Sequence, residues 1–165
     1  MAGYHAVVWR GGKASDLALF KSFVSDRETL AALQKIGGVP GNNLSQKTWD
    51  DRKNRKSSAA DARILGTRIE MLVTWEGLQK PLSLAEILND PGGKGIDLRF
   101  GGNKEIIKNW QSGCIVCLYS CPGSKAGNHA YTVRDFVDKK TRFTVDFERV
   151  PKEKTDVVLI FRLVE

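Results

Sequence analysis

The segment after residue 110 constrains the fold most, because it reads as short apolar strands separated by short polar turns. The predicted strands span residues 114–121, 129–136, 142–149 and 156–164. Connections as short as Asp138–Thr141 join them. Strands that follow each other through so few residues pair antiparallel, since parallel neighbours need a longer crossover. The sequence therefore predicts an antiparallel sheet in this half of the chain.

Most of the predicted helices lie before residue 111. Apolar residues recur at helical spacing over residues 15–35, after a short strand at Tyr4–Trp9. The other expected elements are helices over 84–88 and 103–110, strands at 96–100 and at the end of 63–75, and a polar loop over 45–58. We predict one α+β domain over residues 1–165, with an antiparallel sheet or two-layer β-sandwich flanked by N-terminal helices.

Charge and composition limit the setting in which the chain works. Lys and Asp interrupt every apolar run, so no membrane span is expected, and the N-terminus lacks the features of a Sec signal peptide. Three cysteines are an odd number for a disulfide scaffold and favour a reducing compartment. These observations predict a protein that is cytoplasmic or is delivered into the cytosol of a target cell.

The run Gln111-Ser112-Gly113-Cys114 leads into the first of these strands, and His129 begins the next. In an antiparallel hairpin with an even-numbered loop, Cys114 faces an odd-numbered partner such as Tyr131, and His129 lies diagonally across on the same face, about 7–8 Å away at the backbone. A histidine at that distance can take the proton of a thiol. Cys114 and His129 are therefore the candidate nucleophile and base.

These residues resemble a known group of enzymes. The pattern Ser112-Gly113-Cys114, strand, glycine-rich turn and His129 is similar to the core of the cytotoxic necrotizing factor and Burkholderia lethal factor toxins, and to that of the chemoreceptor deamidase CheD. The similarity covers about residues 106–136. It implies a β-sandwich, a cysteine-dependent glutamine deamidase that acts on a protein as a bacterial toxin or effector, and no cofactor.

Three further residues complete this candidate site. Backbone amides near Ser112 and Gly113 are expected to stabilise the oxyanion or contact the substrate. Glu148, or less directly Asp146, is expected to orient the imidazole, because pairing of Phe136 with Phe143 would place Glu148 diagonal to His129.

Alternative interpretations use some of the same residues. Cysteine is often a buried packing residue, and Cys117 and Cys121 are expected to be core or surface residues that face away from Cys114. His5, alone in the first strand, is likewise expected in the core or on the surface and not in a site. The same alternation of faces weighs against a zinc site built from the three cysteines and His129.

A papain-like protease fold is a second alternative. It would use His129 and Asp146, with Ser57 or Ser58 standing where such an enzyme carries its cysteine.

A basic nucleic-acid-binding module is the non-enzymatic alternative. The net charge is +7, and cations cluster at Lys47, Arg52, Lys53, Arg55 and Lys56. Only Trp49 adds an aromatic ring there, and the acidic pair Asp50-Asp51 interrupts the run, so a solvated surface is the simpler interpretation. In a deamidase, the same charge would attract an acidic protein substrate.

Overall fold

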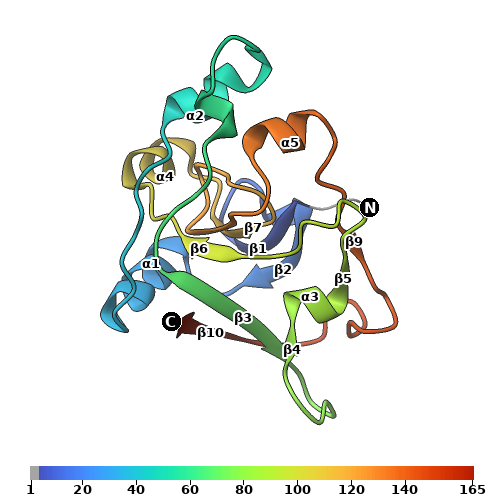
Figure 1. The fold of residues 1–165 in the computed structure, drawn as a ribbon. Coiled ribbons are helices and arrows are strands. Elements are labelled where there is room, and N and C mark those ends of the chain that lie inside the picture. The colour runs from blue at the N-terminus through green and yellow to red at the C-terminus, as the bar shows by residue number, and fades with distance from the viewer. Residues whose placement is uncertain (1–3) are drawn as a thin grey trace.

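A computed structural model describes residues 4–165 and has an α+β fold, as predicted (Figure 1). The main sheet has eight strands in the order β10-β3-β6-β8-β7-β1-β2, with β4 paired to β3. Its strands are β1 (His5–Trp9), β2 (Ala18–Ser22), β3 (Arg68–Thr74), β4 (Leu82–Ser83), β6 (Leu98–Phe100), β7 (Cys114–Cys117), β8 (Ala126–Asn128) and β10 (Val158–Val164). A small second sheet pairs β5 (Leu88–Asn89) with β9 (Thr144–Val145).

Five short α-helices surround the curled main sheet (Figure 1). They are α1 (Asp26–Lys35), α2 (Gln46–Asp50), α3 (Leu84–Ile87), α4 (Lys104–Trp110) and α5 (Val133–Val137). Single 3-10 turns occur at Ser15–Leu17, Asp51–Lys53 and Ala59–Asp61. The predicted strands at 4–9, 96–100 and 156–164 and the helices at 84–88 and 103–110 are confirmed, with small shifts at their ends.

The helix predicted over residues 15–35 is wrong in its first half. Residues Ala18–Ser22 instead form β2, which pairs parallel to β1 and buries Phe20. The helix begins only after Ser25, whose side chain accepts a hydrogen bond from the Glu28 backbone while the Glu28 carboxylate accepts one from the Ser25 backbone. This capping box fixes the start of α1 and overrides the apolar spacing that continues upstream.

The hairpin predicted after residue 110 is also wrong. Strand β8 runs parallel to β7, with Cys117 opposite Gly127. Residues 129–136, predicted as the return strand, turn after His129 and enter α5, because Thr132 and Asp135 form a second capping box. Of the strand predicted at 142–149, only Thr144–Val145 is extended and paired.

A short crossover can join parallel strands here because the strands themselves are short. Parallel neighbours ordinarily need about a dozen residues or more between them, yet residues 118–125 suffice because β7 and β8 are only four and three residues long. The chain from Gly113 to Asn128 is buried throughout. Backbone hydrogen bonds from Leu118 to Tyr4 (2.8 Å) and from Ser120 to Tyr131 (2.7 Å) satisfy polar groups of this buried crossover.

Strand β7 lies at the centre of one cluster of buried side chains that extends from β1 to α5. All four residues of β7 are buried, with β1 on one side and β8 on the other. A central strand with no exposed position is consistent with the continuous apolar sequence of Cys114–Cys117. Any functional group on this strand is therefore held rigidly and shielded from water.

Candidate functional site

The structure brings Cys114 together with His5, the other histidine of the chain, and not with His129. Strands β1 and β7 are antiparallel neighbours, and the His5 Nδ1 atom lies 3.3 Å from the Cys114 Sγ atom. Cys114 is 1% exposed, and His5 is half-buried. From the sequence, His5 is expected in the core or on the surface and not in a site, whereas the structure places its imidazole beside the candidate nucleophile. Its position as the only polar residue in the strand His-Ala-Val-Val-Trp was the available signal.

Cys117 joins the same cluster although it is three residues from Cys114 on one strand. The ligand atoms of His5, Cys114 and Cys117 all lie within 4.8 Å of one another. Strict alternation would place the two sulfurs on opposite faces, but the β1–β7 ladder shifts register twice, between His5 and Val7 and between Val7 and Val8. Such bulges change the direction of side chains, so the prediction that Cys117 faces away from Cys114 is wrong.

The surroundings of Cys114 favour its thiolate form. Hydrogen bonding with Cys117, contact with His5 and the positive charge of Lys125 outweigh burial and lower the pKa of Cys114 to about 6. The hydrogen bond with Cys114 also raises the pKa of His5, against the effect of burial. The two shifts together favour a thiolate–imidazolium pair.

The other two thiols have different surroundings. Burial raises the pKa of Cys117 well above its usual value. Hydrogen bonding with Cys117 lowers the pKa of Cys121. The Cys117 thiol donates a hydrogen bond to the Tyr4 carbonyl oxygen at 3.3 Å, and the adjacent imidazole favours Cys114 as the thiolate.

Alkylation should report this difference between the thiols. In chelator-treated protein, the rate at which iodoacetamide labels Cys114 should rise with pH to a plateau, with a midpoint near the pKa of about 6. Cys117 should stay unlabelled at neutral pH, because its pKa is raised. Peptide mass spectrometry after timed labelling measures the extent of labelling at Cys114 and at Cys117. A midpoint for Cys114 near the usual thiol pKa, or labelling of Cys117 before Cys114, would contradict the conclusion that Cys114 is the thiolate.

The structure places His129 in another environment. Its Nδ1 atom lies 2.8 Å from the carbonyl oxygen of Ile64, and its backbone amide donates to Asp97. The histidine within hydrogen-bond distance of the Cys114 sulfur is His5, whereas the His129 ring contacts the Ile64 carbonyl oxygen. The predicted contact between Cys114 and His129 is therefore not formed.

Glu148 and Asp146 do not orient an imidazole in the way that the hairpin predicted. Glu148 is exposed in a turn, where its backbone amide donates to the Asp146 carboxylate. Asp146 lies 3.6 Å from Arg149. The register that placed Glu148 diagonal to His129 does not exist, because residues 129–136 are not a strand.

Ser112 and Gly113 precede Cys114, but the backbone around them already makes contacts within the protein. The Ser112 hydroxyl accepts from the Cys114 amide at 3.3 Å. A Cβ on Gly12 would lie 2.6 Å from the Gly113 Cα atom, so the two glycines pack face to face. Gly113 also has a φ of +75°, which favours glycine. The close approach at Gly113 is made by Gly12 of the same chain.

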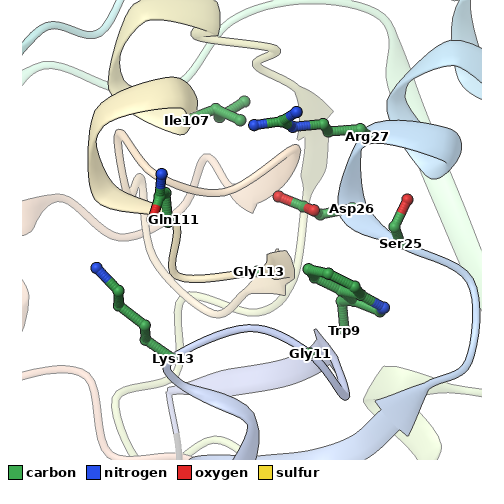
Figure 2. Close-up of a pocket in the computed structure, with 9 residues that line it drawn as sticks. All are labelled: Trp9, Gly11, Lys13, Ser25, Asp26, Arg27, Ile107, Gln111 and Gly113. Carbon is green, nitrogen blue, oxygen red and sulfur yellow. The ribbon is translucent and has the colours of Figure 1, made fainter.

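A cavity of about 480 Å³ borders this segment, and Figure 2 shows the residues that line it. Gly113 forms part of its wall, next to the buried thiol, and Trp9 lies at the end of β1. Two cationic side chains, Lys13 and Arg27, reach the cavity from opposite sides, and Asp26 points into its centre (Figure 2). The lining is Trp9, Gly11, Lys13, Ser25, Asp26, Arg27, Ile107, Gln111 and Gly113.

Asp26 connects this cavity with the interior through an ion pair. Its carboxylate contacts the ammonium group of Lys125, whose side chain is 1% exposed. The charge of Lys125 in turn acts on Cys114. Neither Asp26 nor Lys125 was singled out from the sequence, because nothing in the local pattern shows that a lysine after the turn Pro122–Ser124 is buried.

The basic segment 47–56 is partly neutralised by nearby acids. Lys47 lies 2.7 Å from Asp51, and Arg55 forms two hydrogen bonds with Asp138. Arg52 lies over the Trp49 ring, 4.6 Å from its centroid. These contacts make a surface of paired charges, and the nucleic-acid alternative stays a prediction.

Ser57 and Ser58 lie in the loop that follows this segment. The Ser57 hydroxyl donates to Asp51, and the residues after Ser58 form a single 3-10 turn. A papain-like nucleophile would begin a long helix. The structure places none at this point.

A YdjY domain model matches residues 1–162. The chain belongs to the YdjY domain family. It is 29% identical over 163 residues to the Escherichia coli protein named "Uncharacterized protein YdjY", an alignment that covers 98% of this chain and 68% of the relative. No solved structure matches the chain. Within residues 4–165, no helix has the length and apolar character needed to cross a membrane.

Proposed function

We propose that this YdjY-family chain is a cysteine-dependent hydrolase of carboxamides, with Cys114 as the nucleophile and His5 as its proton acceptor and donor. The 3.3 Å contact between the Cys114 Sγ atom and the His5 Nδ1 atom carries the proposal. A thiol and an imidazole in contact are the minimum arrangement for thiol catalysis. The similarity around Ser112-Gly113-Cys114 supports the glutamine side chain of a protein as the substrate.

In the proposed reaction the Cys114 thiolate attacks the carbon of the carboxamide, forming a C–S bond. The tetrahedral intermediate collapses when the C–N bond breaks, and the His5 imidazolium gives a proton to the departing ammonia. His5 then takes a proton from water, which attacks the thioester. Release of glutamate restores the Cys114 thiolate and the His5 imidazolium.

The cavity beside Gly113 is the proposed route to the thiol. Cys114 is 1% exposed, so the structure around it must open before a substrate reaches the sulfur, and we place this opening at the close contact between Gly12 and Gly113. Lys13 and Arg27 at this cavity would attract an acidic protein surface, in agreement with the net charge of +7. A reducing cytosol would keep the three free cysteines reduced. This cytosol is that of the producing cell, or that of a target cell which the chain enters as an effector.

Mass spectrometry of cytosolic proteins incubated with the chain tests this proposal. Deamidation replaces an amide NH2 by a hydroxyl and releases ammonia, whereas proteolysis shortens a target and simple binding changes no mass. The wild type should produce glutamate from glutamine in at least one target, and Cys114→Ala should produce none. Ammonia release that persists in Cys114→Ala would refute the proposal. Target cleavage would favour the protease alternative.

A further inference from the structure

The convergence of Cys117 on the pair formed by Cys114 and His5 is not needed for hydrolysis. Two sulfur atoms and one imidazole nitrogen from β1 and β7 lie within 4.8 Å of one another. The imidazole and the Cys114 sulfur are 3.3 Å apart. Soft sulfur and nitrogen donors are those that zinc selects, whereas calcium and magnesium require oxygen.

The spacing of these donors is close to that of a tetrahedral zinc site. Zn–S bonds of about 2.3 Å and Zn–N bonds of about 2.0–2.1 Å place tetrahedral ligand atoms about 3.6–3.8 Å apart. All separations in the cluster are at most 4.8 Å, so no pair of ligand atoms needs to approach by more than about 1 Å on binding. Side-chain rotation on two paired strands can supply a shift of this size.

Charge and burial also favour a divalent cation. Cys114 and Cys117 are 1% and 0% exposed, so two thiolates could not coexist there without a counter-charge. One Zn²⁺ with two thiolates and a neutral imidazole has no net charge. The three residues leave a fourth position of a tetrahedral ion for water or another small ligand.

We propose that His5, Cys114 and Cys117 bind one Zn²⁺ ion between β1 and β7. Binding releases two protons, one from the pair formed by Cys114 and His5 and one from the Cys117 thiol, and does not depend on the proposed hydrolase activity. If both proposals hold, zinc occupies the sulfur lone pair that the nucleophile needs, so the loaded protein is inactive and removal of zinc activates it.

The test is a titration of the full chain with Zn²⁺ against a chromogenic chelator, after metal removal and under reducing conditions. The wild type should bind one equivalent, and Cys117→Ser should weaken binding at least about 100-fold. His5→Gln should weaken it similarly, whereas His129→Gln, the matched histidine control, should bind like the wild type. Co²⁺ added in place of Zn²⁺ should give a sulfur-to-metal charge-transfer band that Cys117→Ser weakens.

Two outcomes would overturn the zinc site. One is no binding by folded wild-type protein, and the other is binding of equal affinity in the wild type, Cys117→Ser and His5→Gln. Circular dichroism of each variant separates loss of a ligand from loss of fold, and the half-buried His5 gives a second variant if Cys117→Ser does not fold. The readout uses no substrate, so a failure here differs from a failure of the hydrolase. That failure would appear as absent deamidation in chelator-treated protein.

Discussion

The variant His5→Gln is expected to lower the rate of glutamine deamidation by about 10²–10⁴-fold, the usual range for losing a general acid–base group. It removes the imidazole that lies 3.3 Å from the Cys114 sulfur. It should also raise the pKa of Cys114, because His5 is one of the groups that lower it. The labelling rate of Cys114 with iodoacetamide at neutral pH should fall with the activity, and this readout needs no identified substrate.

His129→Gln is the matched control, because it changes the other histidine to the same residue. His129 lies beside the Ile64 carbonyl and outside the cysteine cluster, so its loss should change the labelling rate of Cys114 by less than the loss of His5 does. If His129→Gln instead slowed deamidation and labelling while His5→Gln left both rates unchanged, the base would be His129, as the sequence predicted.

The variant Asp26→Asn is expected to destabilise the fold by about 3–5 kcal/mol, the cost of breaking a buried ion pair on one side. The Lys125 side chain is 1% exposed and pairs with the Asp26 carboxylate, so removal of that charge leaves an ammonium group in the core without a counter-ion. Urea unfolding monitored by tryptophan fluorescence measures the change.

A double variant separates the charge effect from a packing effect. Lys125→Met together with Asp26→Asn removes both charges and should recover most of the lost stability. Asp16→Asn is the exposed control, since the pair of Lys21 and Asp16 lies on the surface, and its stability should match that of the wild type. A small effect of Asp26→Asn, or a double variant as unstable as the single one, would show that the pair does not stabilise the core.

The sequence predicted the fold class and several single elements better than it predicted which segments pair with each other. Apolar spacing was sufficient for the strand at His5–Trp9 and the helix at Lys104–Trp110, because this signal is local. The order of strands in the sheet depends on packing between distant segments. The pairing of β1 with β7, which brings His5 to Cys114, had no local signal.

The main error arose from one short connection. Residues 118–125 looked like a hairpin loop, and a parallel pair with so short a crossover is unusual. A pattern that was readable, Thr132 followed three residues later by Asp135, marked the start of α5 and would have excluded the strand at 129–136. Without a strand at 129–136, the sequence would not have predicted a contact between His129 and Cys114.

The burial of Lys125 has a consequence for how the protein opens. Lys125 lies on the buried crossover, and Asp26 lies on the first turn of α1. If either segment leaves the core, the charged group of the other stays buried without a counter-ion. Segments far apart in the sequence are thereby tied into one cooperative unit. The same α1 forms one wall of the cavity beside Gly113, so this wall stays fixed while the ion pair holds, and the opposite wall at Gly11 and Lys13 is the part that can move without breaking the pair.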